Sequence, residues 1–388
     1  MQPNRRTAAQ IDSPIRTTYA LLDRRAGRRP LLDMAQAAPS YPPAPELRQH
    51  VAEIAQRTDS GGYVAIEGLP RLREAFAADL RAGYPGDVDP ADVLVTAGCN
   101  QAFCLTASAL ADPGDEFVVA LPYYFNHDMW LKLQGFEPVY VEPGPDHQPS
   151  VPAAKAAITS RTKAILLVSP GNPSGVTIAP DTLAAFATLA ASRGLALIVD
   201  ETYRSFRDTT EPAHALFTRP RWRDTVISLH SFSKDLAIPG YRAGALVASP
   251  ALIRQIAKLA DCVAICAPRI SQEAAWAGLT RAGTWRRERA REVAEKAKAF
   301  ASTMAGAPGG FELVTHGAYF GWVRHPFPDR PTGDVVADLI VRHDLLAIPG
   351  TAFLPDDRRM IRMSFANLEP TAFADLTDRL VAAGVRST

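Results

Sequence analysis

The residues best suited to chemistry surround Lys234, which closes the sequence Ser231-Phe232-Ser233-Lys234 after the predicted strand Val226 to Leu229. An isolated lysine is usually a solvated surface charge, but here hydroxyl groups precede it and Arg242 follows it. These neighbours suit an anionic cofactor that carries a carbonyl group. Because the ordinary lysine pKa is about 10.4, a free amine would serve poorly at neutral pH. An imine linkage to an aldehyde removes that obstacle, and the released lysine could then shuttle a proton.

Two further candidates, Asp200 and Tyr203, follow the apolar run Leu195 to Val199. A carboxylate at the end of a strand can simply cap the next helix. Beside a pyridine ring, however, an ionised Asp200 would keep the ring nitrogen protonated, and the ring needs that proton to accept electrons. Tyr203 could donate a hydrogen bond to a phenolate oxygen of the same ring. Asn172, in the turn Ser169 to Gly175, offers an amide donor for the same oxygen.

The sequence Gly98-Cys99-Asn100 lies between the predicted strand Val93 to Thr96 and a helix that should begin near Gln101. Backbone N–H groups and the helix dipole bind phosphate in such a position. A glycine at a strand-to-helix turn is weak support by itself. Ser231 and Arg242 would complete a phosphate site with hydroxyl and guanidinium donors.

Arg362 is a cation within the otherwise apolar segment Ile361 to Ala366. A buried guanidinium needs an anionic partner, which a structural salt bridge could supply. The carboxylate of a substrate could supply it as well, through two parallel hydrogen bonds. The sequence around Arg362 leaves both readings open.

The elements that must position these residues follow an α/β pattern. Short apolar runs alternate with amphipathic stretches from about residue 70 to 285, which predicts a largely parallel sheet with helices on both faces. The candidate residues follow the strands, and ligands of such sheets bind at the carboxyl ends of the strands. The predicted strands are Val93 to Thr96, Phe117 to Leu121, Ala164 to Val168, Leu195 to Val199, Val226 to Leu229 and Ala243 to Val247.

A second domain should follow a long connecting helix over Trp285 to Lys298. Its predicted elements are strands at Ala318 to Val323 and Met360 to Phe365 and a final helix from Thr371 to Ala383. We therefore expect an N-terminal arm that joins the small domain (residues 1–45), a large domain (46–284) and a small C-terminal domain (285–388).

The composition favours a small-molecule partner. Lys and Arg (42) nearly balance Asp and Glu (41), so the basic excess typical of proteins that bind nucleic acid or anionic lipid is missing. No run of 18 apolar residues occurs, so no membrane association is expected. Four cysteines in 388 residues suit no disulfide framework and predict a cytoplasmic location. Cys262 and Cys266 are expected to be buried thiols, and no metal site is expected.

Together and in this order, these motifs resemble the class I/II aminotransferases, pyridoxal-5′-phosphate (PLP) enzymes of fold type I. The resemblance extends from Leu31-Leu32-Asp33 to the C-terminal helix. It implies a large PLP-binding domain with a mostly parallel central sheet, together with a smaller α/β C-terminal domain. It also implies a homodimer with active sites at the subunit interface.

The resemblance assigns a role to each candidate. Lys234 would be the Schiff-base lysine and proton shuttle, and Asp200 the partner of the pyridinium nitrogen. The remaining cofactor contacts would be Asn172 and Tyr203 at the phenolate oxygen, Tyr124 stacked on the ring, and the phosphate ligands Gly98, Cys99, Asn100, Ser231 and Arg242.

Three further positions concern the partner subunit and the substrate. Tyr63, in Gly61-Gly62-Tyr63, would reach the phosphate of the neighbouring subunit, and Arg362 would bind the substrate α-carboxylate with Asn172 beside it. Ala37 and Ala38 stand where the family usually has a glycine next to the substrate, so Ala38 is also placed at the substrate.

The implied reaction moves an amino group from an L-amino acid to a 2-oxo acid by a ping-pong mechanism. A PLP-dependent β-lyase, or another elimination enzyme, would share the same residues and stays an alternative. A non-catalytic PLP-binding sensor module is a more remote one, because the segment before Leu31 is too short for a DNA-binding domain. The sequence leaves the amino donor open among aromatic, aliphatic and acidic amino acids.

Overall fold

The computed structural model describes residues 1–209 and 211–385. Within them, the central sheet has seven strands in the order β2-β8-β7-β6-β5-β3-β4. The sheet is parallel except at β8, which pairs antiparallel with both β2 and β7. The strands are β2 (Val93–Thr96), β3 (Glu116–Ala120), β4 (Glu137–Val141), β5 (Thr162–Val168), β6 (Ala196–Asp200), β7 (Val226–Ser231) and β8 (Gly244–Val247).

Helices cover both faces of this sheet, as β5 illustrates. Ala164 and Leu166 belong to one buried apolar cluster, and the alternate residues Ile165 and Leu167 belong to a second. Successive side chains of a strand point to opposite faces, so the sheet separates two cores. The helices of this region are α3 (Pro45–Ala55), α4 (Pro70–Gly83), α5 (Cys99–Leu110), α6 (Phe125–Gln134), α7 (Val151–Ala157), α8 (Pro180–Arg193), α9 (Phe232–Asp235), α10 (Pro250–Ala264) and α11 (Arg269–Arg281).

The predicted α/β class and six of the sheet strands are confirmed, whereas β4 was not predicted. It lies at the edge of the sheet beside β3, and its burial pattern shows only Val141 fully buried. Pro138 also interrupts its apolar character, and edge strands are where the sheet tolerates proline. A half-exposed strand with a proline gives a weak sequence signal.

A smaller sheet occupies the C-terminal part of the chain. Its order is β12-β13-β10-β9, with antiparallel pairing throughout. The N-terminal strand β1 (Leu32–Asp33) pairs with β11 (Leu345–Leu346), so the first residues of the chain join its last part. The elements are β9 (Glu312–Gly317), β10 (Phe320–Arg324), β12 (Ile348–Pro349), β13 (Met360–Ser364), α13 (Thr332–His343) and α14 (Ala372–Gly384), and the arm before β1 contains α1 (Arg5–Ala9) and α2 (Pro14–Tyr19).

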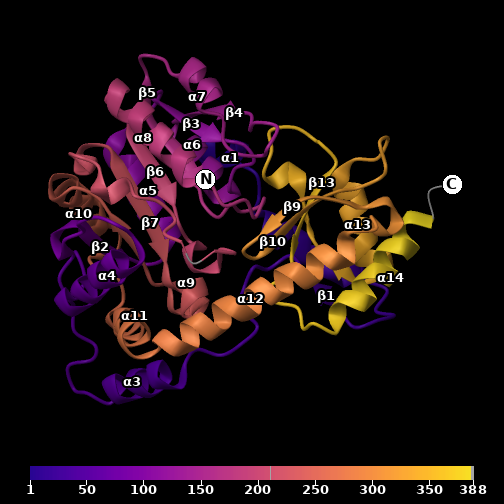
Figure 1. Cartoon of the computed structure of the whole chain (residues 1–388), viewed down its shortest axis with the longest axis horizontal. Helices are drawn as coiled ribbons and strands as arrows, with labels where there is room; N and C mark the ends of the chain where they lie inside the picture. The colour runs from indigo at the N-terminus through magenta and orange to yellow at the C-terminus, as the bar shows by residue number, and fades with distance from the viewer. Residues whose placement is uncertain (210, 386–388) are drawn as a thin grey trace.

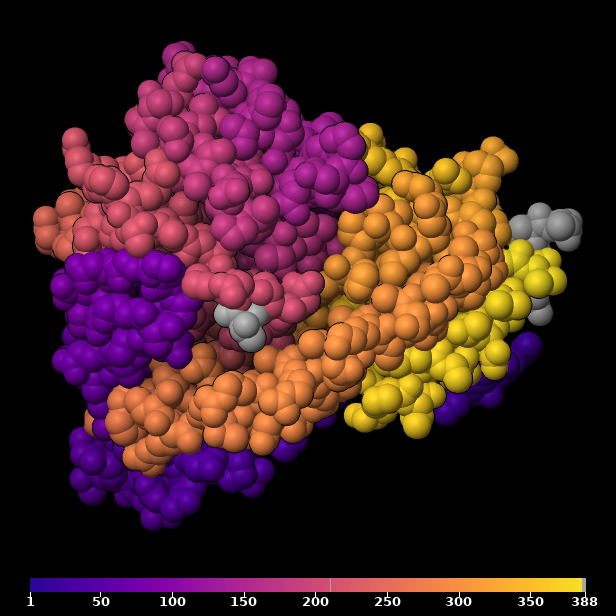
Figure 2. Space-filling view, viewed as in Figure 1, coloured from indigo at the N-terminus to yellow at the C-terminus, as the bar shows by residue number. Residues whose placement is uncertain are grey.

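The long helix α12 (Gly283–Met304) connects the two parts and is longer than the predicted Trp285 to Lys298. Figure 1 shows it running from α11 to the region of α13 and α14, and Figure 2 shows the same helix at the surface. Its buried side chains include Val293 and Phe300. Gly321 of β10 allows the close approach, because a Cβ atom there would lie 2.2 Å from the Phe300 ring.

The expectation that Cys262 and Cys266 are buried is wrong. Cys262 is exposed and Cys266 is partly exposed. Helix α10 buries Ile253, Ile256, Ala257 and Ala260, and this register leaves Cys262 on the outer face. The helix ends at Ala264, so Cys266 lies beyond it and does not share a helical face with Cys262. None of the helices in the described part of the chain has the length and hydropathy that crossing a membrane requires.

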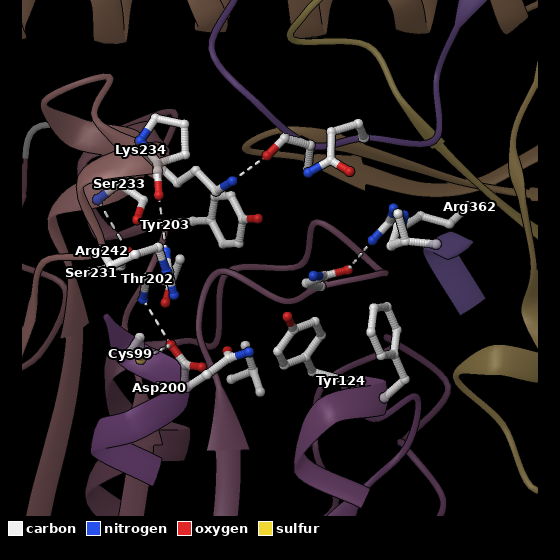
Figure 3. Close-up of a pocket in the computed structure, with 18 residues that line it drawn as sticks. Cys99, Tyr124, Asp200, Thr202, Tyr203, Ser231, Ser233, Lys234, Arg242 and Arg362 are labelled. Atoms are coloured by element: carbon white, nitrogen blue, oxygen red, sulfur yellow. Dashed lines mark hydrogen bonds between the residues drawn. The ribbon is translucent and has the colours of Figure 1, made fainter. Parts of the chain in front are cut away.

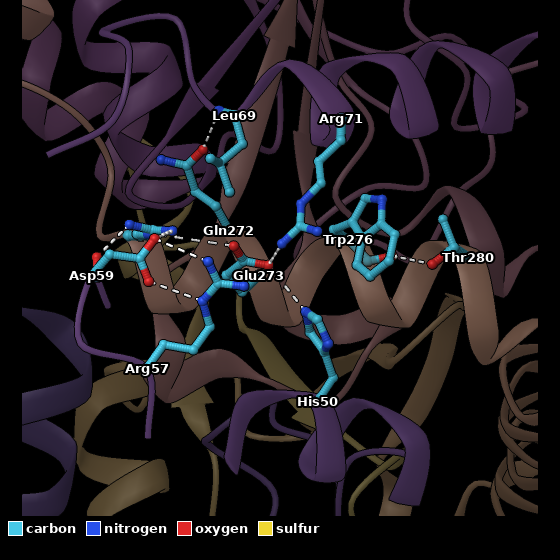
Figure 4. Close-up of polar contacts among 10 residues, drawn as sticks. His50, Arg57, Asp59, Leu69, Arg71, Gln272, Glu273, Trp276 and Thr280 are labelled. Atoms are coloured by element: carbon cyan, nitrogen blue, oxygen red, sulfur yellow. Dashed lines mark hydrogen bonds and ion pairs between the residues drawn. The ribbon is translucent and has the colours of Figure 1, made fainter. Parts of the chain in front are cut away.

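A buried ionic cluster joins α3, α4 and α11 (Figure 4). The Glu273 carboxylate, with its side chain 1% exposed, lies 3.0 Å from Nε2 of His50 and accepts a hydrogen bond from Arg71. Nε of Arg269 lies 4.0 Å from the same carboxylate. Arg269 also donates to the side chain of Asp59, at 3.0 Å, and so links the cluster to the segment before Tyr63.

We expect Glu273→Ala to lower the free energy of unfolding by about 2 kcal/mol, because it leaves the buried His50 ring without its hydrogen-bond partner and Arg71 without its carboxylate. Urea denaturation measures the change. Arg57→Ala is the matched control: its side chain is 57% exposed and pairs with Asp59 near the surface. Such exposed pairs contribute little to stability, so Arg57→Ala should change the free energy of unfolding only slightly. Equal losses for the two variants would contradict a structural role for the buried carboxylate.

Candidate active site

A cavity of about 270 Å³ lies at the carboxyl ends of the central strands. Figure 3 shows Arg362 on one side and Arg242, Ser231 and Cys99 on the other, with Tyr124 and Tyr203 between them. The structure therefore brings together residues that are far apart in the sequence. The predicted site residues that line the cavity are Cys99, Asn100, Tyr124, Asn172, Asp200, Tyr203, Ser231, Lys234, Arg242 and Arg362.

Lys234 lies on the short helix α9, which Ser231 begins by accepting a hydrogen bond from the backbone N–H of Ser233 at 3.2 Å. The lysine amine donates to the backbone carbonyl of Ala37. Burial, together with the positive charges of Arg362 and Arg242, lowers the pKa of Lys234 to about 8. A substantial fraction of the amine is thus neutral near physiological pH, as a nucleophile toward an aldehyde must be.

Asp200 ends β6 and is 4% exposed. Burial by itself raises the pKa of this carboxyl group, but His127 and the Thr202 backbone more than offset it, so the pKa is lowered overall. Nε2 of His127 lies 3.2 Å from Oδ2, and the N–H of Thr202 donates to Oδ1 at 2.9 Å. The Cys99 thiol also lies 3.5 Å from Oδ1. Asp200 is therefore a buried anion held in one orientation beside the cavity.

Tyr203 and Asn172 both present donors to the cavity. Tyr203 is buried against Tyr319 and Phe320, at ring-centroid distances of 5.3 and 5.0 Å. Burial raises the pKa of Tyr203, so its phenol stays protonated and can donate. Arg362 donates to Oδ1 of Asn172 at 3.0 Å, which leaves the Asn172 amide nitrogen as the group free to donate.

Groups that could bind an anion meet where β2 ends and α5 begins. Gly98 precedes α5 with φ of 88°, a conformation that favours glycine. A Cβ atom at Gly98 would also lie 2.5 Å from Nη2 of Arg242, so glycine lets the guanidinium reach the helix start. Ser231 and Arg242 line the cavity beside this N-terminus, where backbone N–H groups and the dipole attract an anion.

Arg362 comes from the smaller sheet and is 2% exposed. Its guanidinium lies 5.1 Å from the Phe320 ring and 5.0 Å from the Phe353 ring. Burial lowers the pKa of Arg362 to about 10, so the group remains a cation at neutral pH. It donates to Asn172 and to the carbonyl of Ala35, both neutral acceptors, and its Nε has no hydrogen-bond partner. Among the described residues no carboxylate forms an ion pair with it, which favours the substrate-binding interpretation over a structural salt bridge.

The structure leaves three predicted site residues outside the cavity lining. Gly98 precedes the start of α5, and Ala38 lies outside the lining although its neighbour Ala37 belongs to it. Tyr63 is 79% exposed and lies on the outer surface of this chain. Besides Ala37, which the sequence placed next to the substrate without assigning it a role, the lining contains residues that sequence reasoning missed: Ile15, Gln36, Phe125, Val168, Thr202, Ser233 and Pro239. No group of three or more His, Cys, Asp or Glu side chains in the described ranges is arranged to hold a metal ion.

Comparison with known proteins agrees with this geometry. The family model "Aminotransferase class I and II" matches residues 29–380. The chain belongs to this family. An aromatic aminotransferase of Arabidopsis thaliana, ISS1, is 30% identical over 360 residues, which cover 90% of this chain and 88% of that protein. An aspartate aminotransferase of Thermotoga maritima is 28% identical, with coverage of 90% and 89%.

The similar solved structures show the same fold. A mutant aspartate aminotransferase of Thermus thermophilus superposes with a TM-score of 0.89 at 24% identity, covering 99% of this chain and 100% of that one. The N-succinyldiaminopimelate aminotransferase of Mycobacterium tuberculosis gives 0.89 at 23% identity, with coverage of 98% and 100%. The expected fold is thus confirmed. The family and its named relatives support a transaminase and do not favour the elimination enzyme or the sensor module.

Proposed function

We propose that this aminotransferase binds PLP in the cavity described above and uses Lys234, Asp200 and Arg362 to transfer an amino group from an L-amino acid to a 2-oxo acid. The observation that carries the proposal is the convergence of these three side chains on one cavity. The donor set also fits the cofactor. An amine with a lowered pKa would face the aldehyde, an ionised carboxylate the ring nitrogen, and a helix N-terminus with Arg242 the phosphate.

When bound, PLP would supply the electron-accepting ring that stabilises charge at the substrate α-carbon. Lys234 would hold the aldehyde covalently, and once displaced by the substrate it would move the α-proton to the cofactor C4′. Asp200 would keep the ring nitrogen protonated, while Tyr203 and Asn172 would donate to the phenolate oxygen. Arg362 would bind and orient the substrate α-carboxylate through two parallel hydrogen bonds. Tyr124 would pack on the ring.

We also propose a homodimer in which Tyr63 reaches the phosphate site of the second subunit. With 79% of its surface exposed, the Tyr63 side chain is free to contact a second subunit. Four free cysteines suit the reducing cytoplasm, which we propose as the location of the enzyme.

The test separates the two half-reactions. The protein is incubated with PLP and freed of excess cofactor, and its absorbance is recorded while single amino acids are added without any 2-oxo acid. We expect a donor to convert the spectrum to that of the amine form, and 2-oxoglutarate or pyruvate to restore it. Ammonia release without conversion of the cofactor would support elimination and overturn the proposed transfer.

A further inference from the structure

The cavity binds a substrate whose side chain has to fit among the groups that remain after the cofactor is accommodated. Three cations line it among the described residues: Lys234, Arg242 and Arg362. Each already has a role in the proposed reaction, at the aldehyde, the phosphate and the α-carboxylate. The lining that the described residues of this chain supply therefore has no further cation for a second carboxylate on the substrate. A buried carboxylate without a cation or strong donors is energetically unfavourable.

The surroundings of Arg362 are aromatic. Besides the Phe320 and Phe353 rings that flank its guanidinium, the Phe125 ring lies 5.5 Å from Phe353 and itself lines the cavity. Tyr124 packs beside Phe125 at 4.9 Å. Phe320 and Phe353 are fully buried and do not line the cavity, so the aromatic surface that a substrate held at Arg362 would meet comes from Tyr124 and Phe125.

The N-terminal arm adds an aliphatic residue to the cavity lining. Ile15 of α2 lines the cavity, although it lies far ahead of the central sheet in the sequence. The first strand of that sheet, β2, begins only at Val93. At the other end of the helix, Tyr19 donates its hydroxyl to Asp33 of β1, which fixes the arm beside Gln36 and Ala37.

A negatively charged group, the Asp33 carboxylate, lies behind the part of the cavity lining that the arm supplies. Asp33 accepts the backbone N–H groups of Ala35 at 3.0 Å and Gln36 at 3.3 Å, and it lies close enough to Arg362 to raise its pKa. Asp33 does not line the cavity itself, so its negative charge would repel an acidic substrate side chain only from behind the lining residues Gln36 and Ala37. The arm therefore favours neutral side chains both by its apolar surface and by its charge.

From this lining we infer that the amino donor is a neutral amino acid with an apolar or aromatic side chain, and that Ile15 helps to select it. The inference rests on the proposed function, since it assumes that Arg362 binds the α-carboxylate. It distinguishes between the kinds of relative that the chain resembles, which include both an aromatic and an aspartate aminotransferase.

Two measurements on the PLP-loaded protein test it. The first compares the rate of cofactor conversion for leucine, methionine and phenylalanine with that for aspartate and glutamate. The second measures the binding of unreactive acids, 3-phenylpropionate against succinate, from the change in cofactor absorbance and in thermal stability. We expect the neutral donors to react at least about tenfold faster at equal concentration, which corresponds to about 1.4 kcal/mol in free energy. We also expect 3-phenylpropionate to bind more tightly than succinate.

Ile15→Lys supplies the missing cation, and Ile11→Lys is its control, because Ile11 is 52% exposed on the same arm and does not line the cavity. We expect Ile15→Lys to weaken 3-phenylpropionate binding and strengthen succinate binding, and Ile11→Lys to change neither. A tenfold preference of the unaltered protein for aspartate or glutamate would overturn the inference, as would identical effects of the two lysine variants. If PLP binds but no amino acid converts it, the proposed function fails instead.

Discussion

Replacing Lys234 by alanine should reduce turnover by at least about 10⁴-fold, the upper end of what a positioned acid-base group contributes. The loss should exceed that of an ordinary proton-transfer residue, because the same amine would also hold the cofactor covalently. The fold should survive. Among the described residues the amine donates only to the Ala37 carbonyl, and its removal relieves repulsion with Arg242 and Arg362.

The measurement combines steady-state turnover with borohydride reduction and peptide mass analysis. The unaltered protein should carry a reduced PLP adduct on the peptide that contains residue 234, and the variant should carry none while its thermal unfolding stays unchanged. Lys258→Ala, at an exposed site on α10, is the control and should keep both the adduct and full turnover. An adduct that persists in Lys234→Ala would place the covalent linkage on a different amine.

Much of this site could be predicted because its residues follow strands. The sequence places Asp200, Ser231 and Asn172 just after apolar runs, and parallel strands bring their carboxyl ends to one edge of the sheet. That rule needs no knowledge of which strands are neighbours. It therefore holds although the strand order, with β8 between β2 and β7, could not be read from apolar periodicity.

Residues that reach the site from outside the sheet could not be predicted in the same way. Ile15 belongs to an arm whose position depends on the pairing of β1 with β11, more than 300 residues later in the chain. Glu273 and His50 likewise meet through tertiary packing of α11 on α3. Neither contact leaves a local pattern in the sequence. The incorrect prediction that Cys262 is buried has a related cause, since residue type says little about which face of α10 meets the core.

Asp200→Asn should lower turnover by about 10² to 10³-fold, the range observed when a single preorganised electrostatic partner is removed. Asparagine has nearly the same shape, so the backbone N–H of Thr202 keeps an acceptor, but the negative charge is lost. Without that charge the ring nitrogen of the cofactor should release its proton at lower pH. The pKa of Asp200 is lowered in the folded protein, so the charge is present at neutral pH and is lost only on acidification below the ordinary carboxyl range. The turnover of the two proteins should therefore differ most at neutral pH. Their cofactor spectra should also change at different pH values.

Glu201→Gln is the matched control, because Glu201 is the next residue, is 2% exposed and carries an ionised carboxylate that does not line the cavity. It accepts a hydrogen bond from Tyr84 at 2.7 Å and lies 3.3 Å from His214. Its loss should lower the free energy of unfolding without altering the titration of the bound cofactor. If both variants lose turnover equally and neither changes that titration, Asp200 stabilises the turn after β6 and the ring nitrogen has a different partner. A change confined to Asp200→Asn would instead show that charge at one carboxylate, rather than burial of acids in general, controls the protonation of the ring.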